Sequence, residues 1–186
     1  MKKMMMIGLV GVGVLLAACS MTSVGKAEAA KSVRPLRVGV YDSRGIAIAY
    51  INSERWDKIL KEKMAAMEQA KKDNDTEKVK ELEAWGPAQQ ARAHQQGFGT
   101  TPVHEYLEAV KDQIPAVAKA AGVELIVSKW ELDYQAADAE TVDVTMELAK
   151  LFNPREKAYQ WIEQIKDKKP IDSKELQRLE KEDPNF

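Results

Sequence analysis

Alternating hydrophobic positions occur near residue 40 and again beyond residue 122, and they predict short β-strands in two distant parts of the chain. Residues 37–42 and 142–144 carry β-branched or aromatic side chains with this period, which is typical of strands. Residues 123–134 alternate as well, but the phase shifts at Ser128-Lys129. Such a shift indicates a bulge, or two strands that meet at a corner.

Between these segments the hydrophobic period changes to three and four, which predicts amphipathic helices. One apolar stripe follows a helix cap at Asn52 or Ser53, ends in the polar residues 71–76, and then resumes. Its members are Trp56, Ile59, Leu60, Met64 and Met67, followed by Val79, Leu82 and Trp85. We predict a helical hairpin with its tip near residues 72–76. An alternative interpretation places the tip at residues 97–101, after one long helix.

Proline and glycine predict where the helices break or end. Gly86-Pro87 is expected to kink or break the second leg of the hairpin, because proline lacks a backbone donor and clashes one turn back. The hairpin is expected to span about residues 52–121, with a kink at Pro115 and an end at Gly122. Residues 45–50 could either continue the first strand or begin a helix.

Further helices are predicted after the last strand. Thr145 is expected to cap a helix that runs to Phe152, and Asn153-Pro154-Arg155-Glu156 has the pattern of a capping box. A last short helix is predicted around residues 173–179. The predicted fold is therefore α+β, with a small β-sheet core built from N-terminal and C-terminal strands, a protruding α-helical hairpin and C-terminal helices.

The first 35 residues predict an export signal, a lipid anchor and a tether. Lys2 and Lys3 precede an apolar stretch at residues 4–18, which is too short to span a bilayer comfortably. The Leu-Ala-Ala that ends it is followed by Cys19, as in the lipobox of bacterial lipoproteins. We expect residues 1–18 to be removed, Cys19 to be lipidated, and residues 19–35 to form a flexible tether. Ser20, in place of an aspartate, favours the outer membrane over the inner one, so the expected location is the bacterial envelope, facing the periplasm.

Composition and the scarcity of reactive side chains argue against several functions. The formal net charge is −1 with both signs interspersed, so we expect no nucleic-acid partner. Cys19 is the only cysteine. His94 and His104, the only histidines, lack the helical spacing of metal ligands. We therefore expect no catalytic residues, metal or cofactor, and we expect that the protein is not an enzyme.

Two groups of residues are candidates for a site. Asp42-Ser43-Arg44 follows the first strand, and either caps the next helix as a structural corner, with Arg44 paired to Glu131 or Asp133, or forms an anion clamp. Trp56, Met64, Met67 and Trp85 either pack within the hairpin or contact a client protein. Trp56 and Trp85 are 29 residues apart, so in the hairpin they lie near the bases of opposite legs, where they could pack together.

The order of these elements resembles the Skp/OmpH family of periplasmic chaperones. The resemblance rests on RVGVYDSRGIAIAY at residues 37–50 and on residues 117–152, which include Tyr134, Asp138 and the element Asp143-Val144-Thr145. It covers about two-thirds of the chain expected after Cys19, although only about fifty residues match in sequence. It implies a homotrimer in which strands build a small central barrel and hairpins enclose unfolded outer-membrane proteins.

The chain departs from that family in its lipobox, its shorter hairpin, its C-terminal extension at residues 153–186 and its charge. Residues 52–85 carry eight Lys/Arg against nine Asp/Glu, so the hairpin lacks the positive potential that would attract acidic clients. The resemblance implies a membrane-tethered holdase or envelope assembly factor that binds unfolded or outer-membrane proteins without catalysis. The alternative is an envelope structural or ligand-binding lipoprotein that reuses the fold.

Overall fold

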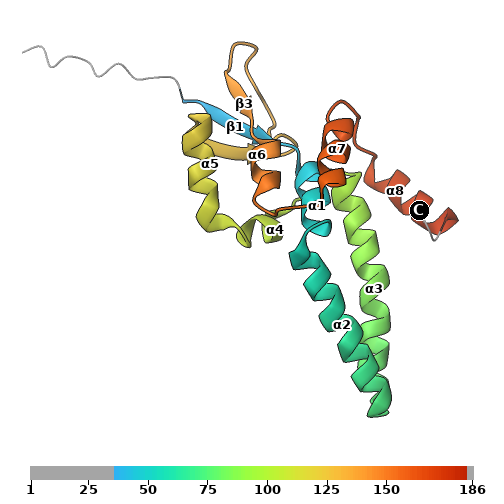
Figure 1. Ribbon diagram of the computed structural model, residues 1–186. Coiled ribbons are helices and arrows are strands. Elements are labelled where there is room, and N and C mark those ends of the chain that lie inside the picture. Colours follow the sequence, from blue (N-terminus) through green and yellow to red (C-terminus); the bar gives the residue numbers. More distant parts are fainter. Residues whose placement is uncertain (1–35, 184–186) are drawn as a thin grey trace, which may run out of the picture. The chain divides into compact units, whose positions relative to one another are not determined.

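The structure, a computed structural model, describes residues 36–183, which lie within one compact unit of residues 35–186. These residues form an α+β fold, as the sequence predicts, with a three-stranded parallel sheet, eight α-helices and one 3-10 helix (Figure 1). The expected signal segment 1–18, the lipidation site Cys19 and the tether 19–35 lie outside the described residues.

The sheet joins the beginning of the described chain to its later part. Strand β1 (Val38–Tyr41) lies between β2 (Leu125–Ser128) and β3 (Thr141–Asp143) and is parallel to both. β2 is four residues long and ends at Ser128, so the predicted continuation to residue 134 is wrong. The chain leaves the sheet there because Glu131 turns back to donate its N–H to the Ser128 carbonyl.

Helices cover one face of this sheet and form the core with it. Residues 45–50 belong to helix α1 (Ser43–Ile51), which packs against α6 (Thr145–Lys150) and α7 (Glu156–Ile165). The side chain of Tyr41 points from β1 into this core. The most deeply buried apolar side chains include Ile46, Val103, Val144 and Leu148.

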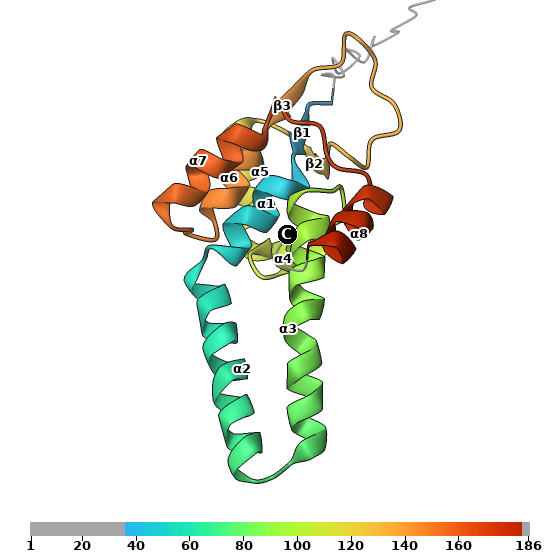
Figure 2. The ribbon, with the colours of Figure 1, turned by 90° about the vertical axis from the view of Figure 1, so that its right-hand side faces the viewer.

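Helices α2 (Glu54–Lys72) and α3 (Thr76–Gly97) form an antiparallel hairpin, hereafter the arm, which extends away from the sheet (Figure 2). The chain turns at residues 73–75, so the tip lies where the first of the two interpretations places it. Ser53 caps α2 by accepting the N–H of Trp56, and Asp75 caps α3 by accepting that of Lys78. Asn74 has φ 54°, a left-handed conformation that asparagine tolerates in turns.

The predicted break at Gly86-Pro87 is wrong, because α3 continues through both residues. Proline removes the hydrogen bond to the carbonyl four residues earlier, but that residue, Glu83, is exposed, so water can solvate the carbonyl. The second leg ends at Gly97, well before the predicted end at residue 121. The arm is therefore shorter than the sequence predicts.

Three short helical segments connect the arm to β2 instead of one long helix. They are α4 (His104–Glu108), the 3-10 helix η1 (Lys111–Gln113) and α5 (Ile114–Ala121). Pro115 lies in the first turn of α5, so it begins a helix rather than kinking one. Gly122 ends α5 with φ 65°, the left-handed C-cap that its position predicts.

The C-terminal extension packs against the rest of the described unit. In α7, Ala158 and Ile162 are buried. Helix α8 (Ser173–Glu182) lies beside α3 and buries Leu176 to 1% exposure. The predicted capping box is wrong, since Arg155 is the N-cap of α7 and its side chain makes no capping bond. The extension is therefore part of the folded unit.

Candidate functional site

Asp42 closes the carboxyl end of β1 and begins α1. Its Oδ1 accepts the backbone N–H of Arg44 at 3.0 Å, which is the ordinary geometry of a helix N-cap. Its own N–H donates to the hydroxyl of Thr145 at 2.9 Å. The prediction that Thr145 caps α6 is wrong, because its hydroxyl accepts the N–H of Asp42 and makes no capping bond. Asp143 accepts the N–H of Thr145.

Arg44 is buried and links Asp42 to the C-terminal end of α7 and to the residues just after it. Its Nε donates to Asp42 Oδ1 at 3.0 Å and its Nη2 to Asp42 Oδ2 at 2.7 Å. Nη2 also donates to the Ile165 carbonyl and Nη1 to the Lys168 carbonyl, at 3.0 and 2.9 Å. Ile165 is the last residue of α7, and its carbonyl also accepts the N–H of Lys168, which lies three residues beyond the helix. The predicted pairing with Glu131 or Asp133 is therefore wrong, and the geometry is that of a structural corner.

Two further side chains, which the sequence did not single out, complete the surroundings of Asp42. Lys129 Nζ lies 2.8 Å from Oδ2, and Trp130 Nε1 donates to Oδ1 at 3.1 Å. The Trp130 ring also contacts both cations, with Arg44 and Lys129 at 5.1 and 4.5 Å from its centroid. Burial alone would raise the pKa of Asp42, but the hydrogen bonds from Arg44, Lys129 and Trp130 hold it below its ordinary 3.8.

We expect this carboxylate to stabilise the fold at neutral pH and to stop doing so in acid. Because the folded-state pKa lies below the ordinary 3.8, its contribution is complete above that value and is lost as the pH falls through the folded pKa. Urea unfolding followed between about pH 6 and about pH 3 should show the midpoint falling towards acid. Asp42→Asn should be less stable near neutrality and lose less on acidification, whereas parallel curves for the two proteins would contradict this role.

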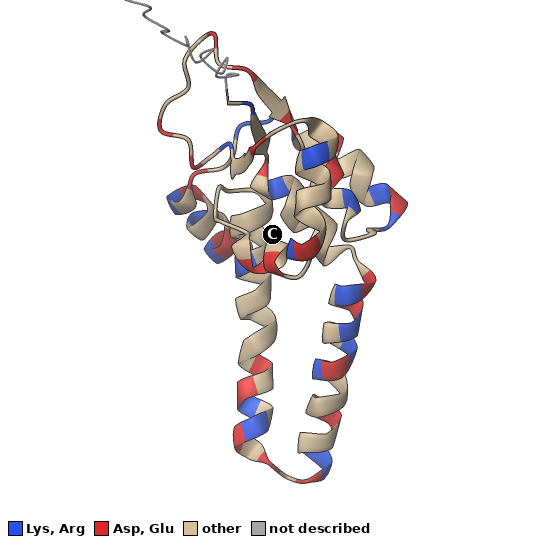
Figure 3. Cartoon of the chain, turned by 90° about the vertical axis from the view of Figure 1, so that its left-hand side faces the viewer, with Lys and Arg blue, Asp and Glu red and all other residues tan. Residues whose placement is uncertain are grey.

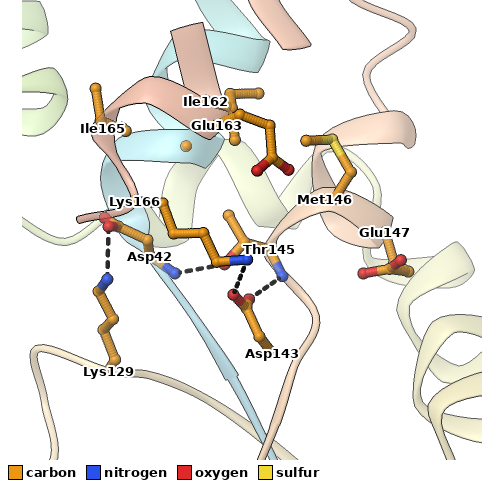
Figure 4. Close-up of a pocket in the computed structure, with 11 residues that line it drawn as sticks. Asp42, Lys129, Asp143, Thr145, Met146, Glu147, Ile162, Glu163, Ile165 and Lys166 are labelled. Carbon is orange, nitrogen blue, oxygen red and sulfur yellow. Dashed lines mark hydrogen bonds and ion pairs between the residues drawn. The ribbon is translucent and has the colours of Figure 1, made fainter. Parts of the chain in front are cut away.

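A pocket of about 180 Å³ opens beside this corner, at the carboxyl ends of β1 and β3 (Figure 4). Four of its charged side chains pair with one another, Asp42 with Lys129 and Asp143 with Lys166, the second pair at 3.7 Å. The carboxylates of Glu147 and Glu163 also line the pocket. Met146 and Ile162 add apolar surface. The carboxyl edge of a parallel sheet is where ligands bind in many α/β proteins, so this pocket could hold a small ligand with both polar and apolar parts.

A second concavity, which we call the tryptophan groove, lies at the base of the arm. Trp56, Leu60, Trp85, Gly86 and Trp161 line it, together with Gln89 and Gln90, and it encloses about 440 Å³. Trp161 comes from α7, so this groove is built from both legs of the arm and from the C-terminal extension. Its surface is mainly apolar, which suits it to bulky apolar groups.

Stacked and tilted aromatic rings connect the tryptophan groove to the core. Trp56 stacks on Trp85 at 6.0 Å between centroids, and Tyr50 lies 5.9 Å from Trp56. Tyr50 in turn stacks on Tyr106 at 3.9 Å and contacts Phe152 edge-on at 5.9 Å. The spacing of Trp56 and Trp85 predicted that these two could meet. No spacing in the sequence pointed to Tyr106, Phe152 or Trp161, which come from three other helical regions.

The two candidate methionines lie further along α2. Met64 is 66% exposed and Met67 is half-buried. Neither lines the tryptophan groove. Their contact with a client therefore stays a prediction for the middle of the arm.

The face of the sheet opposite the helices carries apolar side chains outside the core. By the register, Val38, Val40, Leu125 and Val127 share this face, and Leu125 is 48% exposed. Leu36, Leu132 and Tyr134 are also exposed, and they line a shallow concavity next to Val38. We call these seven residues the open sheet face.

The two histidines lie beside different carboxylates. His94 Nδ1 is 3.5 Å from Glu180 and His104 Nε2 is 3.5 Å from Glu131. Within residues 36–183, no group of three or more histidine, cysteine, aspartate or glutamate side chains is arranged to hold a metal ion. Over the same residues, no helix combines the length and the apolar character needed to cross a membrane.

Comparisons of the chain with protein-family models, with curated proteins and with solved structures find no significant match.

Proposed function

We propose that the chain is a membrane-tethered holdase or envelope assembly factor, of the kind that the Skp/OmpH resemblance implies. It binds unfolded or outer-membrane client proteins and does no covalent chemistry on them. The observation that carries the proposal is the arm, two helices of 19 and 22 residues that extend from a small sheet. The arm and its base present tryptophan and methionine side chains that are only partly buried.

The charge of the arm supports binding through apolar contact rather than through long-range attraction. Positive and negative side chains alternate along α2, whereas residues 84–91 of α3 carry no charge (Figure 3). Such a surface gives little electrostatic steering of an acidic client. Clients would therefore be held where apolar surface is exposed, at the tryptophan groove and around Met64.

The open sheet face supports assembly into a homotrimer. Parallel sheets are normally covered on both faces, yet here Leu36, Leu125 and Tyr134 are 57%, 48% and 83% exposed. Contact between copies of the chain through this face would remove these side chains from water. Three arms held by one central assembly could surround a client together.

The proposal predicts both an assembly state and a holding activity. In light scattering, the protein extending from Cys19 should have the mass of a trimer, and Leu125→Asp should shift it to monomer because the carboxylate could not be buried. At stoichiometric ratios, the wild type should suppress aggregation of a porin diluted from urea. A monodisperse wild-type monomer that leaves porin aggregation unchanged would contradict the proposal.

The pocket at the carboxyl ends of the strands favours a second candidate, a small-ligand-binding lipoprotein. Glu147 and Glu163 would meet a basic group of the ligand, and Met146 and Ile162 its apolar part. In a screen of small amines, a rise in melting temperature that Glu163→Gln abolishes would support this function. A porin-holding activity unaffected by Glu163→Gln would leave the holdase as the better account.

A further inference from the structure

We propose that the tryptophan groove binds unfolded segments in which bulky apolar side chains are flanked by carboxylates. This inference rests on the proposed holdase function and adds the chemical class of client segment that the base of the arm selects. Three features of the groove lead to it: its aromatic floor, a glycine that keeps the floor open, and two lysines beside its aromatic rings.

The aromatic floor provides the apolar contact. Trp56, Trp85 and Trp161 are each only partly buried, and Trp161 remains 37% exposed. Large, rigid aromatic side chains that keep access to solvent are typical anchors of binding surfaces. The volume of about 440 Å³ falls in the range of about 300–1,000 Å³ that is usual for ligand pockets.

Gly86 keeps this floor open. It lies in the interior of α3, where glycine is the least favourable residue after proline. A methyl group on Gly86 would meet no atom within 4 Å, so the packing of the protein does not require a glycine there. Gly86 lines the tryptophan groove, and the space that its missing side chain leaves is unfilled.

The two lysines give the groove its selectivity. Lys63 Nζ lies 5.5 Å from the Trp85 ring centroid and Lys157 Nζ lies 5.1 Å from that of Trp161. Within residues 36–183 neither ammonium forms an ion pair with a carboxylate, whereas the nearby Asp57 is paired with Arg155 at 3.1 Å. Two of the aromatic rings that line the groove therefore each have a cation beside them, and a segment with acidic residues beside its apolar ones would match these cations.

Labelled peptides test this selectivity directly on full-length protein held in zwitterionic nanodiscs. The probe is a heptapeptide, Glu-Asp-Leu-Phe-Leu-Asp-Glu, and its counterpart has lysine in place of every acidic residue. In fluorescence anisotropy at low salt we expect the acidic peptide to bind about tenfold or more tightly than the basic one. Lys63→Glu should remove most of that preference, whereas Lys61→Glu, the same charge change two residues away on α2, should leave it intact.

Filling the groove tests the location. Gly86→Leu should place a side chain in the free space and weaken binding of the acidic peptide at least about tenfold, while Ala88→Leu, on an exposed position of the same helix outside the groove, should not. Both replacements introduce a good helix former, so neither should lower the melting temperature. Equal affinity of wild type and Gly86→Leu for the acidic peptide would overturn the inference.

The failure of the inference can be told apart from that of the proposed function. If the wild type suppresses porin aggregation but binds both peptides alike, the groove is not the selective site and the holdase proposal stands. If Gly86→Leu blocks peptide binding but the wild type holds no porin, the groove stands as a peptide site and the holdase proposal falls. Displacement of the peptide by nanodiscs that contain anionic lipid would overturn the inference in favour of a lipid occupant.

Discussion

Replacing Arg44 with alanine is expected to lower the free energy of unfolding by about 3–5 kcal/mol, because removing one partner of a buried ion pair leaves the other without compensation. Arg44 is 2% and Asp42 4% exposed. The variant would also remove the Arg44 donor from the Lys168 carbonyl and one of the two donors from the Ile165 carbonyl. Urea denaturation of the wild type and the variant at neutral pH, with equal slopes, would measure the loss.

The environment of Asp42 sets the size of this effect and suggests its controls. Lys129 and Trp130 still contact the carboxylate in the variant, which argues for the lower half of the range. Arg178→Ala removes an arginine that also contacts two carboxylates, Glu175 and Glu182, but on the exposed surface of α8. Because exposed ion pairs are screened by solvent, it should cost far less than Arg44→Ala. If Arg44→Ala and Arg178→Ala lowered the free energy of unfolding by the same small amount, Arg44 would not hold α7 to Asp42 at the start of α1.

The corner shows why part of the site could not be predicted from the sequence. The cap at Asp42 is a local feature, and the residue order Asp-Ser-Arg after a strand was sufficient to suggest a cap as one of two alternatives. The main partners of Arg44 beyond Asp42 are backbone carbonyls at residues 165 and 168. Every residue carries a backbone carbonyl, so no pattern of side chains distinguishes these two, and the search for a charged partner selected Glu131 and Asp133 instead.

The arm shows the same division between local and long-range information. Its tip and its apolar stripe follow from neighbouring residues, so the period of the stripe predicted both legs and the meeting of Trp56 with Trp85. The continuity of α3 through Pro87 depends on solvent access to the helix, which the local pattern does not contain. Trp161 approaches the arm only because α7 packs on α1, a tertiary contact between residues more than a hundred positions apart.

Replacing Tyr106 with alanine is expected to cost about 3–5 kcal/mol of unfolding free energy, as for other buried aromatic side chains. Tyr106 lies in α4, is 8% exposed and stacks on Tyr50 with an interplanar angle of 10°. Burial raises the pKa of its hydroxyl to about 12, so the neutral hydroxyl donates a hydrogen bond to Gln96 Oε1. Gln96 is fully buried near the end of α3, and Tyr106 therefore fixes the base of the arm to the core.

Tyr106→Phe separates the ring from its hydroxyl. It keeps the stack on Tyr50 but leaves the buried Gln96 oxygen without this donor, so it should cost about 1–3 kcal/mol. Because Tyr50 also contacts Trp56, and Trp56 stacks on Trp85, loss of the Tyr106 ring should loosen the tryptophan groove as well. Hydrogen exchange of residues 50–60 and 85–97 should therefore accelerate in Tyr106→Ala more than in Tyr106→Phe. Unchanged exchange in these segments would mean that the arm is held to the core without the aromatic contacts.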